Sequence, residues 1–129
     1  MIEHSPILII RNLGDATITY VNDAVCKLFN ISKESIIGHK WLTDLTQDEK
    51  RTILDSLNIA NNNLGSFKTI VPYKLKDGTE KTIEWNTSPI FDSAGKFTGE
   101  YQGLGFDITE KTFIKKELHQ KESQLEIFF

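Results

Sequence analysis

The feature that most constrains this chain is a short passage near its C-terminal end. An apolar run spaced by glycines, Gly103-Leu104-Gly105-Phe106, leads into Asp107-Ile108-Thr109-Glu110, and a charged segment with helical periodicity follows without a break. The run predicts a β-strand, and the charged segment predicts a helix that begins where the strand ends. A helix attached in this way moves with the last strand of its domain. This order favours a domain that passes on a conformational change over one that turns over a substrate.

Length and composition exclude several classes of protein. The 129 residues fit one domain, and 39% hydrophobic with 26% charged residues is ordinary for a soluble globular chain. The net charge of −3 offers no basic excess for nucleic acid. No apolar run approaches the roughly 18–20 residues that span a bilayer. Cys26 is the only cysteine, which excludes an internal disulfide and a cysteine metal cluster and makes the cytoplasm the expected location.

The N-terminal half of the chain predicts a β-hairpin followed by three or four short helices. The expected elements are strands over residues 7–10 and 17–21 around a turn at 12–15, and helices over 24–29, from 32 to a stop at 38, and from 46 to about 63. Asn22-Asp23 is suited to cap the first helix, and Thr46 with Glu49 is suited to cap the long one. Leu54 and Leu57 belong to the apolar stripe of that long helix.

From Ser66 onward the apolar pattern alternates with a period of two, which is typical of β-strands. The expected strands cover residues 66–74, 81–90 and 97–108, with turns at 76–79 and 92–96. In the middle strand Ile83, Trp85 and Thr87 share one face. The complete order predicts an α+β fold, in which a five-stranded antiparallel sheet carries helices on one face, with a pocket between the two layers and a C-terminal exit helix.

Several local sequences resemble, in order and spacing, the PAS sensor domains of signalling proteins. They are Ile18-Thr19-Tyr20-Val21-Asn22, residues 29–38, Lys76-Asp77-Gly78, Ser88-Pro89-Ile90, and Gly99 through Asp107-Ile108-Thr109-Glu110. The resemblance implies a PAS-like fold and a sensory module of the kind found in the sensor histidine kinases of bacteria and archaea. It divides the chain into a PAS sensor domain, residues 1–110, and a helical linker, residues 111–129, that leads to a downstream module.

The C-terminal tail resembles the linkers that join PAS domains to a following sensor or kinase domain. Ile114, Leu118, Lys121, Leu125 and Phe128 follow one another at spacings of 4, 3, 4 and 3 residues, which is the seam of a coiled coil with one lysine in it. This seam predicts a homodimer. The two consecutive phenylalanines at the end predict that the chain is a piece of a longer signalling protein.

The sequence contains neither of the motifs by which PAS relatives bind an adduct-forming flavin or a haem. Light-sensing relatives form a flavin adduct through a cysteine in an Asn-Cys-Arg-Phe-Leu motif, but residues 36–41 stand in that region and Cys26 lies one helix too early. Haem-binding relatives use a histidine of the long helix, and residues 48–62 contain none. His39 is the remaining geometric candidate for an axial ligand, and a redox flavin without an adduct stays open. The cofactor is therefore unknown.

Candidate pocket residues follow from position in the expected fold. Those from helices and loops are Val25, Phe29, Ile36, Trp41, Leu54 and Leu57, and those from strands are Ile70, Trp85, Tyr101 and Gln102. Trp41, Trp85 and Tyr101 are the strongest of these because each joins an apolar body to a hydrogen-bonding tip. The alternation of the last strand leaves open whether its odd or its even positions face the pocket.

Asp107 and Thr109 are the expected signal-coupling residues. Either side chain can accept hydrogen bonds from the first amides of the exit helix, a cap that stabilises a helix by about 1 kcal/mol. The resemblance adds a second role, in which the cap couples the last strand to the linker so that a shift of the strand alters the helix.

No catalytic constellation accompanies these residues. Cys26 lacks a histidine in a motif that would activate it, and no phosphate-binding glycine loop or metal-ligand spacing is present. His119 lacks the neighbouring residues of a kinase phosphoacceptor. The chain is therefore expected not to be an enzyme, and any kinase activity would belong to a downstream domain.

The leading interpretation is a cytoplasmic sensor or interaction module that binds a small ligand or a partner and biases a dimeric C-terminal linker. One alternative is a structural dimerisation module with a filled core and no ligand. A second is a haem or redox-flavin sensor. A third is a small α+β enzyme, which would need titratable groups that converge in its cavity.

Overall fold

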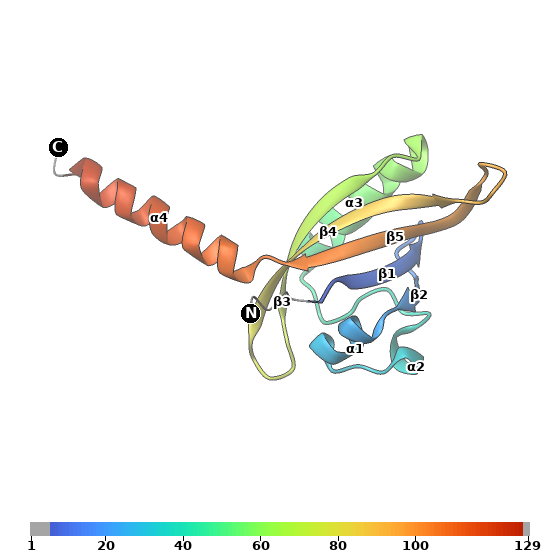
Figure 1. Ribbon diagram of the computed structural model, residues 1–129, viewed down its shortest axis with the longest axis horizontal. Coiled ribbons are helices and arrows are strands. Elements are labelled where there is room, and N and C mark those ends of the chain that lie inside the picture. The colour runs from blue at the N-terminus through green and yellow to red at the C-terminus, as the bar shows by residue number, and fades with distance from the viewer. Residues whose placement is uncertain (1–5, 128–129) are drawn as a thin grey trace.

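Five strands form one antiparallel sheet in the order β2-β1-β5-β4-β3, and helices lie against one of its faces (Figure 1). The computed structural model describes residues 6–127 and the side chains of residues 6–118. The elements are β1 (Leu8–Leu13), β2 (Ile18–Val21), α1 (Asp23–Phe29), α2 (Lys33–Ile36), α3 (Gln47–Asn63), β3 (Phe67–Lys74), β4 (Glu80–Phe91), β5 (Phe97–Asp107) and α4 (Thr109–Ile127). The predicted α+β fold with its exit helix is confirmed.

The first strand continues past the position predicted for its turn. Asn12 and Leu13 remain in β1 because they pair with Tyr101 and Glu100 of β5. The turn expected at residues 12–15 therefore begins two residues later. Pairing with a strand far away in the sequence outweighed the local turn chemistry here.

Both predicted helix caps are confirmed. Asn22 Oδ1 accepts a hydrogen bond from the Val25 amide at 3.2 Å at the start of α1. Thr46 and Glu49 form a reciprocal capping box at the start of α3, in which each side chain accepts from the backbone amide of the other residue. Asn22 also accepts from the amide of Ile9 in β1 at 3.2 Å, so the same side chain fixes α1 to the sheet.

Strand alternation sorts the side chains between an inner face, under the helices, and an outer face. One inner row crosses the sheet from Leu8 through Gly105 and Trp85 to Thr69. Trp85 lies directly over Gly105, where an added Cβ would stand 2.5 Å from the indole Cζ3. The main buried cluster includes Trp85 and the fully buried Phe29 of α1, and it joins the helices to the sheet.

A bulge in β5 sets the register of the last hairpin. Phe91 pairs with Phe97 and Pro89 pairs with Tyr101, so one residue of β4 stands opposite three of β5 between these pairs. Gly99 lies in this stretch with φ +92°, a conformation that side chains with a Cβ rarely adopt. The bulge decides which residues of β5 meet the beginning of β4.

One residue, Ile108, separates β5 from helix α4, which points away from the sheet (Figure 1). Ile114 and Leu118, the first two positions of the predicted coiled-coil seam, expose 55% and 56% of their surface. The other seam positions and the linker histidine lie outside the described side chains: Lys121, Leu125, Phe128 and His119. Within residues 6–127, α4 and the other helices include none long and apolar enough to cross a membrane.

Candidate ligand cavity and signal junction

A cavity of about 90 Å³ lies between the inner face of the sheet and the helical layer. Its lining comes from β1, β2 and their turn (Ile10, Asn12, Ala16, Ile18), from the loop before α3 (Lys40, Trp41, Leu42, Leu45), from α3 (Ile53, Leu57) and from β3, β4 and β5 (Phe67, Thr69, Tyr73, Trp85, Thr87, Gly103). Most of these side chains are apolar, and a few polar groups stand among them. This composition suits a small ligand that is largely apolar.

The polar groups on the sheet side of the cavity are neutral. Asn12, Thr69 and Thr87 contribute amide and hydroxyl groups. The Tyr73 hydroxyl is already engaged, because it accepts a hydrogen bond from Trp85 Nε1 at 2.9 Å. Burial raises the pKa of Tyr73 far above its ordinary value, against the opposing effect of that hydrogen bond, so the phenol stays neutral. The cavity thus offers hydrogen-bonding groups without a charged base on this side.

Three of the predicted pocket residues line the cavity: Trp41, Leu57 and Trp85. Three others, Val25, Phe29 and Ile36, are buried in the main cluster, where they hold α1 and α2 against the sheet. They form part of the core around the cavity and are not among its lining residues.

Two further candidates pack beside the cavity rather than in its wall. Tyr101 belongs to a second buried cluster with Leu57 and Ala60, and the partly buried Leu54 packs against this cluster. The Tyr101 hydroxyl donates to Asn61 Oδ1 at 2.6 Å, which directs its polar tip toward the end of α3. The Tyr101 hydroxyl therefore forms a hydrogen bond as predicted, but this bond holds α3 against β5 and does not face the cavity.

The remaining two candidates lie on the outer face of the sheet, and their assignment to the pocket is corrected here. Ile70 is 56% exposed on β3. Gln102 of β5 points to the same side, where its Oε1 accepts from Arg11 Nε at 3.1 Å. Because successive side chains alternate between faces, their neighbours Thr69 and Gly103 line the cavity instead. The odd positions of β5 are the inner ones, which answers the question that its alternation left open.

Sequence reasoning missed most of the lining residues, although a signal was present for some. The alternation over residues 67–73 already separates the odd positions from Ile70, and it is sufficient to select Phe67, Thr69 and Tyr73. Asn12 and Lys40 carry no comparable signal, because only the tertiary arrangement of a strand end and a loop brings them to the cavity.

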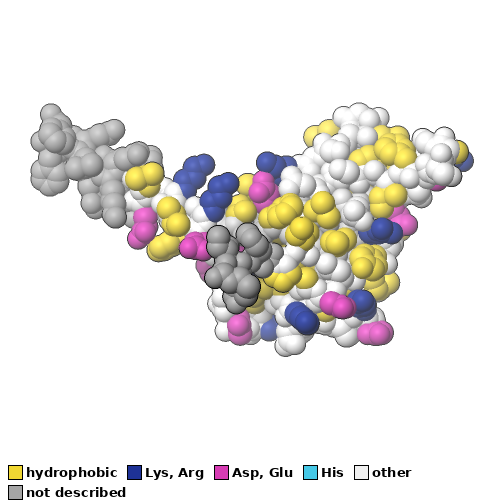
Figure 2. Space-filling view, viewed as in Figure 1, with side chains coloured by type: hydrophobic (Ala, Val, Ile, Leu, Met, Phe, Trp, Pro, Cys, Tyr) yellow, Lys and Arg dark blue, Asp and Glu magenta, His cyan; other side chains and the backbone are white. Residues whose placement is uncertain are grey.

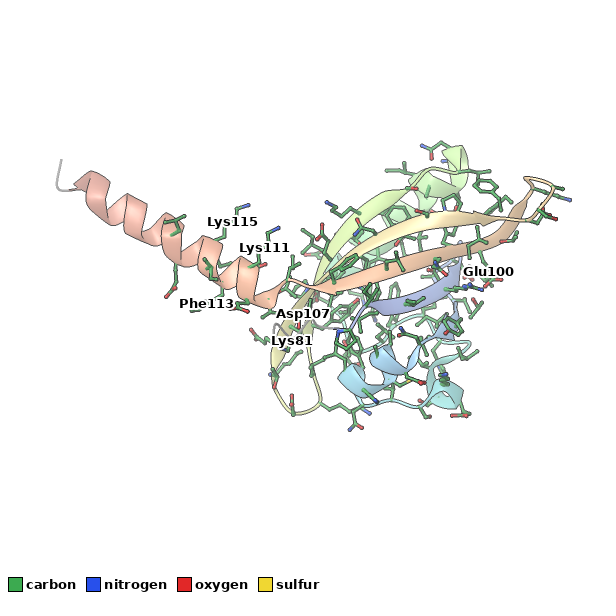
Figure 3. The ribbon with its side chains drawn as sticks, in the orientation of Figure 1. Lys81, Glu100, Asp107, Lys111, Phe113 and Lys115 are labelled. Atoms are coloured by element: carbon green, nitrogen blue, oxygen red, sulfur yellow. The ribbon has the colours of Figure 1, made fainter. Side chains whose placement is uncertain are left out.

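A hydrogen-bonded junction joins the end of β5 to α4 and to β4. Figure 3 labels Asp107 and Lys81 where β5 leads into α4. Asp107 Oδ1 accepts hydrogen bonds from the backbone amide of Thr109 at 3.0 Å and from its hydroxyl at 2.5 Å. The Thr109 hydroxyl oxygen accepts one from the amide of Thr82 in β4 at 2.9 Å. Lys81 Nζ lies 3.5 Å from Asp107 Oδ2. The two predicted coupling residues are thus brought together, and Lys81 and Thr82 are partners that the sequence did not reveal.

The charge at the junction is a stable carboxylate. Burial by itself raises the pKa of Asp107, but the hydrogen bonds from Thr109 and the nearby Lys81 ammonium outweigh it, and the pKa lies below its ordinary value. The geometry also differs from the simple cap expected from the sequence, because the Thr109 hydroxyl binds β4 rather than its own helix. The junction therefore spans three elements.

The cysteine and the histidine considered for cofactor binding are not among the residues that line the cavity. Cys26 is half-buried on α1 and packs against the main cluster. His39 is exposed and lines an outer groove. Among the described residues that form the cavity wall there is neither a cysteine nor a histidine.

An antiparallel sheet with helices on one face, a cavity beneath them and a helix leaving its last strand is the architecture of a sensory α+β module. Residues 2–108 match the family model described as the PAS fold, and the match ends one residue before α4 begins. The chain belongs to the PAS family.

Known relatives agree with this assignment. Sporulation kinase E of Bacillus subtilis is 29% identical over 109 residues, which is 84% of this chain and 14% of the kinase. An RNA-binding light-oxygen-voltage receptor has a TM-score of 0.71 at 22% identity, over 91% of this chain and 34% of that one. The PAS domain of the RpfR quorum-sensing receptor from Cronobacter turicensis, solved in complex with BDSF, has a TM-score of 0.69 at 13% identity, over 84% of this chain and all of that one. At these identities the structural matches establish the fold alone.

Proposed function

We propose that this PAS domain binds a small ligand in the cavity under α3 and passes a conformational change through β5 to α4. The observation that carries the proposal is the position of Gly103, which lies in the cavity wall and in the same strand as Asp107, four residues away. A ligand that packs better against one position of β5 than another shifts the population of the two states. The strand connects the two sites directly.

The junction is suited to report such a shift. Asp107 ends β5, Thr109 begins α4, and Thr82 belongs to the neighbouring strand, so one set of hydrogen bonds joins all three elements. Sliding of β5 along β4 would lengthen the contact between Thr109 and Thr82 while the contact between Thr109 and Asp107 remained. The direction of α4 would then change with the register of the two strands.

The module acts as a homodimer, with α4 pairing along its apolar positions. Ile114 and Leu118 are one helical turn apart and more than half exposed, which supports a helix partner. Ile70 and Phe106 add exposed apolar surface on the outer face of the sheet, at 56% and 38%. In the view of Figure 2, hydrophobic side chains gather over the part of the molecule that the sheet occupies. A second copy of this chain would present the same apolar positions, so it is the expected partner for α4 and for the outer face of the sheet.

The output domain is a histidine kinase in the same polypeptide, downstream of α4, and the chain itself catalyses no reaction. Similarity to Sporulation kinase E supports this context, and this chain corresponds to 14% of that kinase. A cytoplasmic two-component system is the setting in which such a sensor and kinase work together.

The test of the coupling role is Asp107→Ala in the full-length kinase. Loss of the carboxylate releases Thr109 and Lys81, so we expect the ligand response of autophosphorylation to fall at least several-fold while circular dichroism shows a folded domain. Asp92→Ala is the matched control, because Asp92 Oδ1 accepts from two backbone amides at 2.9 Å in the β4–β5 turn, away from α4. An unchanged response in folded Asp107→Ala would remove the coupling role.

A ligand-free dimerisation module is the second candidate, and the size of the cavity is the observation in its favour. About 90 Å³ is well below the ~300–1,000 Å³ of most ligand pockets. Native mass spectrometry of the purified chain separates the two candidates. An added mass that is lost on denaturation supports the sensor, and a bare dimer supports the structural module.

The same volume weighs against a haem or a redox flavin. Both cofactors are far larger than a cavity of about 90 Å³, so they would require the loop before α3 to move. Visible absorption of the purified chain tests this alternative directly.

A further inference from the structure

The cavity borders a second hollow of a different character. A groove of about 630 Å³ shares Lys40, Trp41 and Leu42 with the cavity wall. The cavity is mainly apolar, whereas the groove is lined by four lysines, Lys40, Lys50, Lys74 and Lys76, and by the single carboxylate of Asp44. In a chain with a net charge of −3, this is a local reversal of charge. An apolar hollow and a basic one therefore meet at Trp41.

The ammonium groups of the groove are largely uncompensated. Within residues 6–118 the ion pairs are Lys33–Asp23, Lys68–Glu84 and Lys81–Asp107, and none of them uses a lysine of the groove. Lys50 Nζ stands 5.7 Å from the centre of the Trp41 ring, in the range of a cation–π contact. This contact directs a positive charge to the residue that separates the two hollows.

Two polar contacts near the groove do not neutralise the positive charge of its lysines. Lys76 Nζ donates to the carbonyl oxygen of Asn30 at 2.7 Å, a neutral partner that does not cancel its charge. Asp15 lies near enough to Lys40 to respond to its charge, but its carboxylate accepts a hydrogen bond from the Thr17 amide and stays in its own turn.

We propose that the site binds a small amphipathic carboxylate, with its hydrocarbon part in the cavity and its carboxylate in the groove. This rests on the proposed ligand-binding function. A cavity of roughly 150 Å³ holds a benzene molecule. The present cavity, at about 90 Å³, therefore takes a shorter aliphatic group, and the carboxylate extends past Trp41 toward Lys40 and Lys50.

A hydroxyl group without a partner lies in the same groove. Thr43 lines it, and Thr43 Oγ1 is shielded from solvent with no hydrogen-bond partner among the described residues. Buried hydroxyl groups normally have a partner. A carboxylate oxygen that entered beside Leu42 would be an acceptor for this hydroxyl after a small rotation of the side chain.

The test compares three probes of equal chain length: butanoate, butan-1-ol and butylammonium. Each is titrated into the isotope-labelled 129-residue chain, and binding is followed by NMR at the indole N–H signals of Trp41 and Trp85. We expect butanoate to bind most tightly, butan-1-ol more weakly and butylammonium least. Added salt should weaken the binding of butanoate and leave the binding of butan-1-ol unchanged, because salt screens only the contact between charged groups.

Charge variants locate the carboxylate. Lys40→Gln and Lys50→Gln should each weaken the binding of butanoate by roughly two- to fivefold. Lys50 lines the groove and not the cavity, so Lys50→Gln should leave the binding of butan-1-ol unchanged. Lys96→Gln is the matched control, because Lys96 is exposed in the β4–β5 turn and lines neither hollow. Equal weakening by Lys96→Gln would mean a general effect of net charge and would overturn the groove assignment.

The outcomes separate this inference from the function on which it rests. Equal binding of butanoate and butan-1-ol at the cavity overturns the carboxylate class and leaves the ligand cavity in place. Preferred binding of butylammonium also overturns it. If none of the three probes shifts the indole signals, the carboxylate proposal fails together with the proposed ligand-binding function.

Discussion

The two tryptophans mark two regions of the interior that are packed in opposite ways. Trp85 is 6% exposed, lies over Gly105 and donates to the Tyr73 hydroxyl at 2.9 Å. Trp41 is half-buried, borders both hollows and has Lys50 beside its ring. Both rings line the cavity, but Trp85 does so from within the packed core, whereas Trp41 also borders the open groove.

The difference follows from the elements that hold the two rings. Trp85 stands in β4, between β3 and β5, so backbone pairing on both sides fixes its position. Trp41 stands in the loop before α3, and residues 40–45 of this loop take part in none of the backbone hydrogen bonds that hold the described turns and loops. Loops carried by a rigid scaffold are where binding sites concentrate. We infer that the Trp85 region supplies stability, which leaves the Trp41 region free to remain hollow.

The largest effect that this comparison predicts is that of Trp85→Ala. Removal of a buried indole from the core should lower the free energy of unfolding by about 3–5 kcal/mol, because the transfer energy is lost and the space between the sheet and the helices is enlarged. Urea unfolding followed by circular dichroism measures it. A loss below about 1 kcal/mol would show that the region is not the stabilising one.

Gly105→Ala tests how closely the Trp85 ring packs against β5. Its Cβ would stand 2.5 Å from the Trp85 ring, so the ring must move, and the free energy of unfolding should fall by about 2–3 kcal/mol. Gly103→Ala is the matched control, because its Cβ would approach nothing closer than Thr87 Oγ1 at 3.3 Å. Equal losses for the two variants would mean that strand glycines matter for backbone reasons and not for contact with Trp85.

The filled region is also the part that could be predicted from the sequence. Period-two alternation placed Ile83, Trp85 and Thr87 on one face, and the three are buried together. Polar side chains before apolar stripes located the caps at Asn22 and Thr46. These signals are local, because each depends on residues within one element, and local signals survive in a single sequence.

The open region could be predicted only in part, because Trp41 was a candidate from its position and most of the other lining residues were not. The lining of the cavity depends on a loop and on the end of β1, and no periodicity describes either. The partners of Asp107 and Thr109 were missed for a related reason. If the two strands are paired residue by residue from the β4–β5 turn, the partner assigned to Thr82 is wrong by two positions. The reason is that the bulge at Gly99 adds two residues to β5 and none to β4. Tertiary register is not contained in local patterns.

Tyr73→Phe removes the acceptor of the Trp85 indole and leaves the ring packing in place. The buried Nε1–H group then has no partner, and the free energy of unfolding at neutral pH should fall by about 1–2 kcal/mol. This loss should be smaller than that of Gly105→Ala, because no atom is forced to move. Urea unfolding of both variants at the same temperature tests the order.

The same tyrosine predicts a dependence on pH. Burial raises the pKa of Tyr73 in the folded chain far above the value of 10.0 that is usual for the unfolded chain. Above about pH 10 the unfolded chain therefore binds fewer protons than the folded one, and stability falls as the pH rises. Wild type should lose more stability than Tyr73→Phe over this range. Parallel curves for the two proteins would show that the phenol ionises freely in the fold.

Trp41→Ala should have the smallest effect on stability, about 1 kcal/mol or less, although it removes as many atoms as Trp85→Ala. The stability lost when a large side chain is replaced by a small one depends on how much buried surface is lost and on how much new cavity remains after the neighbours relax. Trp41 loses less burial because it is only half-buried, and it leaves less new cavity because the open groove, which Trp85 does not reach, already lies beside it. Urea unfolding measures the loss, and titration of butanoate measures what the wall contributes to binding. A loss as large as that of Trp85→Ala would mean that the loop before α3 is as much a part of the core as the sheet. The contrast between a filled and an open region would then fail.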